Sequence, residues 1–474
     1  MRSLHVLGGA LVLSLVAVGC SFTTAGNFTE CKTDVDCGSG YACSSGYCLP
    51  LPTGCKRDEP GGKRKAFEEE SRIPLVALFP ITGTDGKSDD SQVQSANAIK
   101  LAISEANDRL TPDRGFFGLF VCDTGAADAG GILTQAPWFI TNLQAPAMFT
   151  ANSGPTRELA GNAIRRDAGT MLISPNATSP ELTVIFQSDP SVWRVAPPDN
   201  FQAAVLAKVV ASDFPDAGST RIAIIYPSPD SYGDGFANPL LEQLSMRGYT
   251  TSLHPYTEGD PASHITAVTG AVNRSPNASI IIGTPPDCVP IIERAKTFPA
   301  LTRANGHRWY FTDSGKDVAL ITPTTATEVD GAFGTAPAQG AGAAFATFRD
   351  VFTTRYAIDP NSTNFVSHSY DAAWLVMLAA QYAEGKDPAN RSKITGPRVS
   401  EGMSKLALST GPATQLRADK WAELSSALSS GVATNVEGTS GQLDLDLDAG
   451  FAMSPYEVWQ ITDGGITVRR LMSP

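Results

Sequence analysis

The stretch IPLVALFPITGTDGKSDD, residues 73–90, is the part of this 474-residue sequence that decides its fold. Its first seven residues are all apolar or proline, which predicts a strand buried on both faces of a sheet. Pro80 ends that strand, and a polar loop leads into a helix from about Ser91. Apolar residues then recur at steps of three and four from Ala96 to Ala106, as expected for one buried helix face.

The same alternation of buried strand and amphipathic helix continues along the chain. Helices are predicted over 200–213, 236–247 and 265–273, and a closing pair of strands over 441–447 and 456–462. The other predicted strands are 118–121, 147–150, 171–174, 221–226, 279–283 and 309–312. This alternation predicts the α/β class, with doubly wound and mainly parallel sheets. The length exceeds what one core usually holds, so two lobes are expected.

The N-terminus has the pattern of an export signal. Arg2 precedes an apolar run over 4–18, and the sequence Ala17-Val18-Gly19-Cys20 resembles a bacterial lipobox. We therefore predict a signal peptide over 1–19 and a lipid on Cys20, which makes the mature protein an exported, lipid-anchored protein of the bacterial cell envelope. An ordinary signal peptide cut elsewhere is the alternative. No other stretch approaches the ~20 apolar residues of a membrane helix.

Eight cysteines occur, and five of them crowd into one short segment. These five predict a small disulfide-rich module over 20–55, because an exported chain meets oxidising conditions. They are Cys31, Cys37, Cys43, Cys48 and Cys55. Zinc is the alternative, although the spacings lack a paired C-x-x-C and no metal site is expected. With Cys20 lipidated, one cysteine is left free or pairs between chains, and the isolated Cys122 and Cys288 are expected to be buried apolar residues.

The charge of the chain excludes two classes of partner. A formal net charge of −12 and a pI near 5.0 argue against nucleic acid and against a basic membrane-binding face. Residues 56–71 are rich in charge and poor in apolar side chains, which predicts a linker after the module.

Two motifs carry a family resemblance. One is Pro80-Ile81-Thr82-Gly83, and the other is SPNATSPEL over 174–182. Together they resemble the type I periplasmic binding proteins of the branched-chain amino acid (Leu/Ile/Val-binding) ABC-transporter substrate-binding family. The resemblance covers about 72–469 and implies two lobes, 72–198 with 334–454 and 199–333 with 455–474. The chain would cross between them near 196–200, 331–336 and 453–456.

The resemblance also implies ligand-binding residues in the first lobe. Ser153 and Thr178 stand where amino-acid-binding relatives grip the α-carboxylate and α-amino groups. The Gly154 N–H and the Asn176 carbonyl would be backbone partners. Helix N-termini also suit a carboxylate in general. Serine and threonine before helices are common N-caps as well, so a purely structural role is the alternative.

In the second lobe, the resemblance implies Tyr232 and Asp313 as ligand contacts. Tyr232 stands where the family's ring closes over the ligand, and Asp313 stands where amino acid binders carry a partner for the ammonium group. The alternatives are a tyrosine that packs on its own lobe and a solvated loop aspartate.

The family implies a solute-binding protein that captures an amino acid or similar small polar ligand and delivers it to an ABC permease. A ligand sensor or cell-surface interaction protein on the same fold is the rival prediction, favoured by the added cysteine-rich module. No G-x-S-x-G elbow, histidine pair at metal-ligand spacing or acid–base pair stands out, so neither catalysis nor a cofactor is expected.

Overall fold

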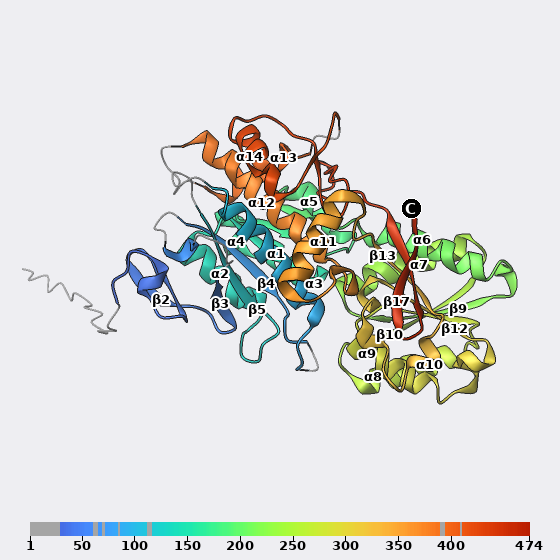
Figure 1. The fold of residues 1–474 in the computed structure, drawn as a ribbon. Coiled ribbons are helices and arrows are strands. Elements are labelled where there is room, and N and C mark those ends of the chain that lie inside the picture. Colours follow the sequence, from blue (N-terminus) through green and yellow to red (C-terminus); the bar gives the residue numbers. More distant parts are fainter. Residues whose placement is uncertain are drawn as a thin grey trace, which may run out of the picture.

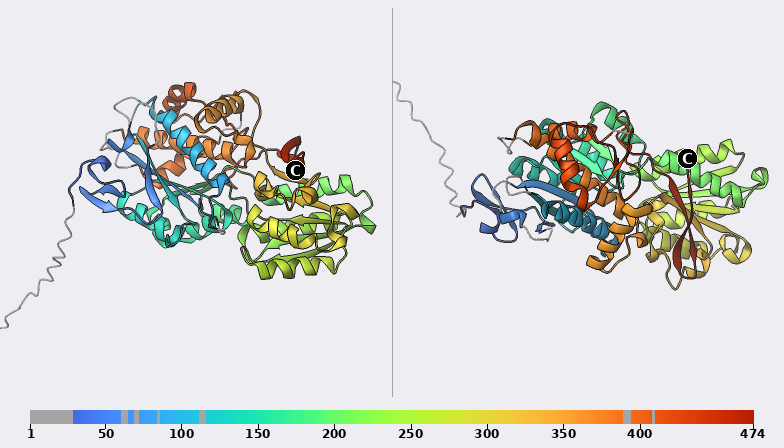
Figure 2. Two further views of the ribbon diagram at one scale, coloured as in Figure 1. Left: turned by 60° about the horizontal axis from the view of Figure 1, so that its bottom comes forward. Right: turned by 45° about the horizontal axis from the view of Figure 1, so that its top comes forward.

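The computed structural model describes residues 29–59, 65–68, 72–83, 86–110, 116–388, 394–407 and 410–474. The predicted signal peptide and Cys20 lie outside these ranges. Figure 1 shows two α/β lobes side by side, with a small N-terminal module on the far side of the first lobe from the second. Figure 2 shows the same arrangement from two other directions. The predicted fold class, a two-lobed α/β protein with parallel sheets and a disulfide-rich N-terminal module, is confirmed.

The first lobe is built on a six-stranded sheet in the order β3-β5-β4-β6-β7-β8, parallel except for β3. Its strands are β3 (Cys55–Asp58), β4 (Ile73–Phe79), β5 (Phe117–Asp123), β6 (Ala147–Thr150), β7 (Met171–Ser174) and β8 (Val192–Arg194). Successive side chains of β4 enter the cores on opposite faces of the sheet. One core contains Leu75, Ala77 and Phe79, and the other contains Val76 and Leu78. A fully buried Leu or Val contributes about 1.5–3 kcal/mol, so the apolar run of β4 stabilises both layers.

Helices cover both faces of this sheet. The helices on one face are α1 (Asp90–Asn107), α11 (Gly342–Tyr356), α12 (Val366–Lys386), α13 (Gly396–Ser404) and α14 (Trp421–Ser429). The other face carries α2 (Ile132–Leu143) and α3 (Ser153–Gly161), and the short helices α4 (Ala163–Ala168) and α5 (Glu181–Ser188) complete the lobe. The predicted first helix begins at Asp90, because the Asp89 side chain accepts a hydrogen bond from the Gln92 N–H and caps it.

The second lobe has a seven-stranded sheet in the order β10-β9-β11-β12-β13-β16-β17. Its strands are β9 (Arg221–Pro227), β10 (Thr250–Tyr256), β11 (Ala278–Ile281), β12 (Arg308–Phe311), β13 (Phe333–Pro337), β16 (Tyr456–Thr462) and β17 (Gly465–Met472). The first five strands of that order are parallel and the last two antiparallel. Helices α6 (Asp199–Asp213) and α7 (Ser231–Met246) pack on one face, and α8 (Pro261–Val272) and α9 (Pro285–Ala295) on the other.

The chain crosses between the lobes three times. The first and second crossings are each hydrogen-bonded to the third. The Tyr456 hydroxyl donates to the Pro198 carbonyl at 3.0 Å, and the Ala338 N–H donates to the Pro455 carbonyl at 3.0 Å. The second crossing differs from the prediction at 331–336. Strand β13 pairs with β12 and β16 and keeps the chain in the second lobe through Pro337. The predicted boundary between 333 and 334 is therefore too early.

The predicted closing strand over 441–447 is wrong. β16 pairs instead with β17, which follows it in the chain. Leu443 and Leu445 are buried in the core of the first lobe, but the segment makes only isolated bridges, Glu437 with Gln442 and Leu445 with Ala452. The alternation of buried and exposed side chains in this segment resembles that of a strand, but the segment does not pair with a neighbouring strand of a sheet.

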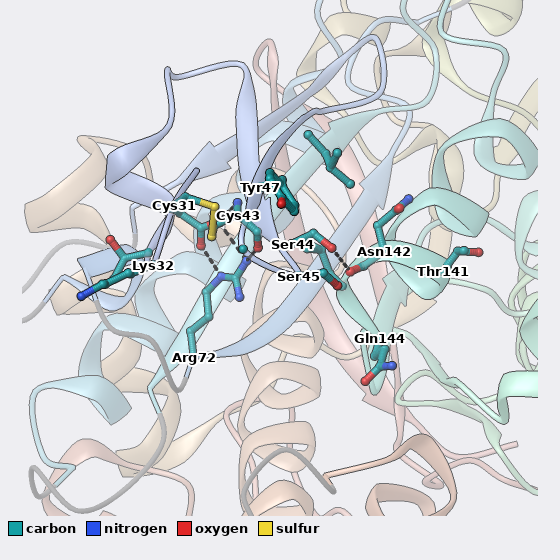
Figure 3. A pocket seen from close by; sticks show the side chains of 15 residues that line it. Cys31, Lys32, Cys43, Ser44, Ser45, Tyr47, Arg72, Thr141, Asn142 and Gln144 are labelled. Carbon is teal, nitrogen blue, oxygen red and sulfur yellow. Dashed lines mark hydrogen bonds and ion pairs between the residues drawn. A yellow bond between two sulfur atoms is a disulfide. The ribbon is translucent and has the colours of Figure 1, made fainter. Parts of the chain in front are cut away.

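The N-terminal module is a hairpin of β1 (Tyr41–Ser44) and β2 (Tyr47–Pro50) that rests on the first lobe. The Ser44 hydroxyl donates to the Asn142 carbonyl at 2.5 Å, and Arg72 forms an ion pair with Asp34. A surface hollow of about 950 Å³ lies between the module and the end of α2 (Figure 3). The module lies on the side of the first lobe remote from the second lobe (Figures 1 and 2), and the residues that line the hollow belong to the module and the first lobe, so the hollow is distinct from the junction between the lobes.

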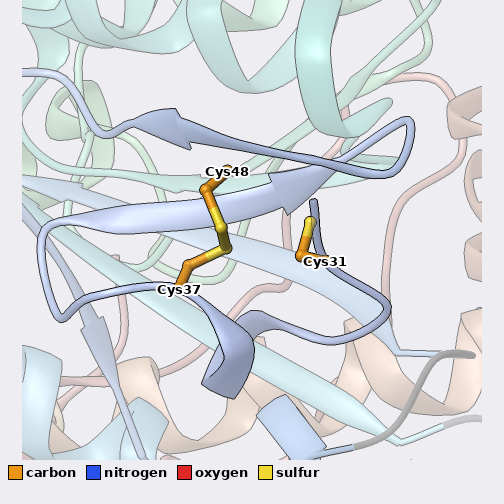
Figure 4. Close-up of side chains that lie close together, drawn as sticks. All are labelled: Cys31, Cys37 and Cys48. Atoms are coloured by element: carbon orange, nitrogen blue, oxygen red, sulfur yellow. A yellow bond between two sulfur atoms is a disulfide. The ribbon is translucent and has the colours of Figure 1, made fainter. Parts of the chain in front are cut away.

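Two disulfides hold the module together, Cys31–Cys43 and Cys37–Cys48. The sulfur atoms of Cys31, Cys37 and Cys48 lie within 4.8 Å of one another (Figure 4). All three are bonded to other sulfurs, so none is a free thiolate for a metal ion. The prediction of disulfides over zinc is confirmed for these cysteines.

Cys55 forms a disulfide as predicted, but its partner is Cys122, outside the module, and this third bond joins the N-terminal region to the first lobe. Strand β3 pairs antiparallel with β5 and places Cys55 directly opposite Cys122. Cys122 is therefore not a free apolar residue, and the segment predicted as a linker over 56–71 begins as an edge strand of the sheet. Cys288 is the free cysteine of the described residues, and it is buried. Within the same described ranges, no helix combines the length and apolar character that a bilayer crossing requires.

Candidate ligand-binding site

The carboxyl ends of parallel strands from both lobes meet at the junction between them. The loops after β6 and β7 come from the first lobe, and those after β9 and β12 from the second. The Ser231 hydroxyl on α7 donates to the Glu181 carboxylate on α5 at 3.1 Å, so the lobes contact each other directly here. Gly235 on α7 also lies against Ser179 and Pro180. Ligands of doubly wound sheets bind at such strand ends, which makes this junction the candidate site.

Ser153 is the first residue of α3 and Thr178 lies in the loop after β7; both are buried in the first lobe. The Ser153 hydroxyl oxygen accepts hydrogen bonds from the N–H groups of Thr178 at 3.1 Å and Ser179 at 3.0 Å. A hydroxyl has two lone pairs and one hydrogen, so Ser153 keeps only its hydrogen for a further partner. The Thr178 hydroxyl is buried, and it lies close enough to the Asp199 carboxylate to lower the pKa of that group as a hydrogen-bond donor.

Gly154 and Asn176 lie beside this pair. Helix α3 begins at Ser153 without a side-chain cap from Asn152, so the N–H groups of Ser153 and Gly154 have no partner inside the helix, whereas the Thr156 N–H donates to the Asn152 carbonyl at 3.3 Å. Asn176 holds the loop in place, because its side-chain oxygen accepts from the Asn152 N–H at 2.9 Å. A methyl group placed on Gly154 would lie 3.8 Å from an Asp230 carboxylate oxygen, so this helix start faces the second lobe.

Tyr232 and Asp313 form one hydrogen-bonded group in the second lobe. The Tyr232 hydroxyl lies 2.7 Å from Thr312 Oγ1 and 2.9 Å from Asp313 Oδ1. The same Asp313 oxygen accepts a hydrogen bond from the Gln202 side-chain amide at 3.0 Å. Asn364 of the first lobe donates to the Asp313 backbone carbonyl, which ties the group to the opposite lobe.

Asp313 is only 3% exposed, so the alternative of a solvated loop aspartate is wrong. Burial raises the pKa of Asp313 from its ordinary 3.8 to about 6, although the hydrogen bonds from Tyr232 and Gln202 oppose this rise. Burial also raises the pKa of the Tyr232 phenol well above its usual range, and the carboxylates of Asp313 and Asp199 add to that shift. The phenol therefore remains a hydrogen-bond donor at neutral pH.

A second buried carboxylate, Asp199, was missed in the sequence. It begins α6 and is fully buried, and its N–H donates to the Thr178 carbonyl at 2.8 Å. Burial raises the pKa of Asp199 well above its ordinary value, and the nearby Asp313 carboxylate raises it further. The Thr178 hydroxyl and the Arg194 guanidinium act in the opposite direction.

The six predicted residues thus lie at helix starts and strand-end loops that face the same junction: four on the first lobe, at Ser153, Gly154, Asn176 and Thr178, and two on the second, at Tyr232 and Asp313. Sequence reasoning missed Asp199, Gln202 and Asn364. The signal for Asp199 was its place directly after Pro197-Pro198, at the predicted first crossing.

The arrangement separates donors from acceptors. The first lobe offers a hydroxyl hydrogen at Ser153 and backbone N–H groups at the start of α3. The first crossing and the second lobe offer carboxylate oxygens at Asp199 and Asp313. Such polarity complements a small ligand that has a negative group at one end and a positive group at the other.

Comparisons with known proteins identify the family of the chain. A family model described as the receptor family ligand binding region matches residues 94–464. The chain is 26% identical over 413 residues to the chemotactic signal transduction system substrate-binding protein BasB of Halobacterium salinarum, a match covering 84% of this chain and 89% of that protein.

Two solved structures show a similar fold. One is a leucine binding protein, LivK, from Thermotoga maritima, with a TM-score of 0.66 at 17% identity over 85% of this chain and 99% of that one. The other is an ABC transporter solute binding protein from R. palustris in complex with benzoate. Its TM-score is 0.59 at 14% identity, and the match covers 85% of this chain and 97% of that one. The chain belongs to the receptor family ligand binding region, and its fold is that of the two-lobed type I periplasmic binding proteins.

Proposed function

We propose that this protein is an extracytoplasmic solute-binding protein that captures an amino acid or a similar small polar ligand between its lobes. The observation that carries the proposal is the facing pair of donors and acceptors at the junction. Ser153 has only its hydrogen left to donate, which suits a ligand carboxylate, and Asp313 offers a buried carboxylate to an ammonium group. We expect Gly154, Asn176, Thr178 and Tyr232 to contribute to the same site.

Binding without chemistry is part of this proposal. The buried Cys288 thiol donates to the Gly283 carbonyl at 3.2 Å, and burial raises its pKa well above the ordinary value. A thiol in that state is a poor nucleophile. The related proteins named above are described as binding proteins.

The experiment that tests the proposal is a thermal-shift screen of the purified, oxidised protein. The panel contains the twenty amino acids, small carboxylates including benzoate, sugars and polyamines. A ligand at a hundred times its dissociation constant stabilises the folded state by about 2.7 kcal/mol, which is a measurable shift. Stabilisation by one chemical class supports the proposal, and a flat response to the whole panel contradicts it.

Anchoring and partner belong to the same proposal. Export with a lipid on Cys20 would hold the protein at a membrane surface, where an ABC permease could receive the ligand. Labelling cells with a radioactive fatty acid tests the anchor: wild-type protein should carry the label, and a Cys20→Ala variant should not. An unlabelled wild-type protein would contradict the lipid anchor and favour an ordinary signal peptide.

A ligand sensor is the second candidate function, and one observation favours it. The relative from Halobacterium salinarum is described as part of a chemotactic signal transduction system. The N-terminal module, with its own surface hollow away from the lobe junction, offers a place for a partner other than a permease. Deleting the gene separates the two functions: loss of uptake of the identified ligand favours transport, and retained uptake with a lost behavioural response favours sensing.

A further inference from the structure

A buried ion pair lies next to the turn that carries Asp313. Lys316, in the loop after β12, is 2% exposed and forms an ion pair with Glu457 of β16, which is 3% exposed. Glu457 is two residues before Trp459, so its side chain leaves the sheet on the same face, toward the apolar core under α8 and α9. Water screens neither charge, so each depends on the other.

Stability alone does not account for such a pair. Taking two charges out of water costs free energy that their attraction repays only in good geometry, and apolar pairs of similar volume often replace a buried ion pair without loss. Removing one partner alone is strongly destabilising, because the other charge stays buried. What a hydrogen-bonded ion pair adds over an apolar pair is a fixed geometry between the two segments that carry it.

At one end of the pair, Lys316 closes the turn of Asp313. This turn is η6 (Asp313–Gly315), and the Lys316 N–H donates to the Asp313 carbonyl at 3.0 Å. The Asp313 carboxylate accepts hydrogen bonds from Tyr232 and Gln202. The anchored side chain of Lys316 therefore sets where the whole turn stands relative to β16.

At the other end, Glu457 lies where the three crossings between the lobes meet. It directly follows Tyr456 of the third crossing, whose hydroxyl donates to the Pro198 carbonyl of the first. In the sheet, Glu457 lies opposite Ala336, just before the second crossing. The ion pair thus fastens the turn of Asp313 to the segments about which two lobes can move.

The first lobe reaches the same turn from its own side. The Asn364 amide donates to the Asp313 carbonyl. His368 on α12 is buried, and neither of its ring nitrogens has a hydrogen-bond partner among the described residues. Burial and the charge of Lys316 lower the pKa of His368 from 6.5 to about 3, so the ring is neutral and places no like charge beside Lys316.

We propose that Lys316 and Glu457 are a positioning pair, which holds the turn of Asp313 against the lobe crossings and so places the Asp313 carboxylate where it binds the ligand. Neither residue touches the ligand, since both act through Asp313. This inference deepens the proposed solute-binding function, because Asp313 is one of its ligand contacts.

The test uses a double variant, Lys316→Met with Glu457→Gln. It removes both charges and keeps side chains of similar length, so no buried charge is left alone. The two single variants accompany it. Lys100→Met is the matched control, because it also breaks a lysine ion pair, with Asp58 in the first lobe, far from the turn. Thermal melting checks that each variant is folded.

The first measurement is hydrogen–deuterium exchange of the ligand-free proteins, followed on peptides by mass spectrometry. In the double variant, the amides of 312–317 should exchange about tenfold faster than in wild-type protein. Peptides from β9 and β11, in the centre of the same sheet, should exchange as before. A pair that serves only the stability of the lobe would change all of these peptides together or none of them.

The second measurement is titration calorimetry with the twenty L-amino acids as probes. The amino acid that wild-type protein binds most tightly should bind the double variant about tenfold more weakly, which corresponds to roughly 1.4 kcal/mol. Each single variant should lose about as much as the double variant, because release of either end frees the turn. Lys100→Met should change the affinity less than about twofold.

Wild-type affinity in a folded double variant overturns the inference, whatever the exchange shows, and leaves the proposed function standing. Unchanged exchange at 312–317 overturns it as well, because the turn then keeps its place without the pair. If wild-type protein binds none of the amino acids, the proposed ligand class is wrong, and the exchange alone decides whether the pair positions the turn. Should the double variant not fold, Glu457→Asp, which keeps both charges and shortens one partner, takes its place with the same outcomes.

Discussion

Ser153 holds the ligand-binding loop of Thr178 in place: its hydroxyl oxygen accepts the Thr178 N–H at 3.1 Å and the adjacent Ser179 N–H at 3.0 Å. The structural and ligand-binding roles of Ser153 are therefore compatible. Its lone pairs order the loop, and its hydrogen remains for the ligand.

Replacing Ser153 by alanine should reduce both stability and ligand affinity. The change leaves two buried N–H groups without an acceptor, and each such group costs roughly 1–3 kcal/mol. Urea denaturation followed by circular dichroism measures the loss. Ser188→Ala is the control, because that exposed hydroxyl bonds only the Ile185 carbonyl of its own helix. An unchanged free energy of unfolding for Ser153→Ala would show that water replaces the hydroxyl.

Gly235 allows the two lobes to approach each other. A methyl group at this position would lie 2.9 Å from Ser179 Oγ and 3.3 Å from Pro180 Cδ across the junction. We expect Gly235→Val to hold the lobes apart and to weaken ligand binding at least tenfold, while the stability of each lobe changes little. Small-angle X-ray scattering with saturating ligand should then report a larger radius of gyration than for wild-type protein.

Gly161→Ala is the control, because no described residue has an atom within 4 Å of a methyl group at that end of α3. Normal affinity and a normal radius of gyration in Gly235→Val would mean that the contact between α7 and Ser179 is not required for closure.

Much of the fold was predictable because a buried strand can be recognised from the apolar residues of that one segment. The uninterrupted apolar run of β4 has side chains in both cores of its lobe, and Ile222 to Tyr226 of β9 do the same in the other lobe. The segment 441–447 was misread for the same reason. Its leucines are buried, but a strand also needs a neighbouring strand, which no local pattern reveals.

The parts that sequence missed depend on the register between distant segments. Cys55 pairs with Cys122 because β3 adds to the edge of the sheet beside β5, which is a tertiary contact. Asp199 reads in sequence as an ordinary acidic residue in the first turn of a helix, a favourable position for any carboxylate. Only the crossing of the chain between lobes brings it near Thr178 and Asp313.

Ligand affinity should fall in acid, because an amine needs ionised carboxylates. Burial raises the pKa of Asp313 to about 6 in the ligand-free protein, with Asp199, Tyr232 and Tyr456 as the titratable groups that face it. One pH unit below its pKa a carboxyl is about 10% ionised, so affinity should drop about tenfold between pH 7.5 and pH 5 from Asp313 alone. Titration calorimetry across this range measures the change.

The raised pKa of Asp313 has the opposite effect on the stability of the ligand-free protein, which should increase in acid. A carboxyl whose pKa is raised by folding stabilises the folded state below its unfolded pKa, near 3.8, and this contribution is lost as the pH rises through about 6. Asp313→Asn should therefore raise the melting temperature of the ligand-free protein at pH 7.5 and abolish the acid-dependent loss of affinity. An affinity that stays constant from pH 5 to pH 7.5 in wild-type protein would contradict an ionised Asp313 at the site.

The disulfide between Cys55 and Cys122 should stabilise the first lobe without affecting ligand binding. It fastens the edge strand β3 to β5 across 67 residues of sequence, whereas the candidate site follows β6 and β7 farther along the sheet. Replacing both cysteines by alanine should lower the free energy of unfolding of this lobe by about 2–4 kcal/mol, since a cross-link restricts the unfolded chain. Denaturation of the oxidised proteins measures the loss.

Replacing Cys31 and Cys43 instead should leave the lobe as stable as before, because that bond closes a short loop inside the module. Ligand affinity should change less than twofold in both double variants. A large loss of affinity without Cys55–Cys122 would mean that the N-terminal region supports the ligand site through the sheet, and would link the module directly to binding.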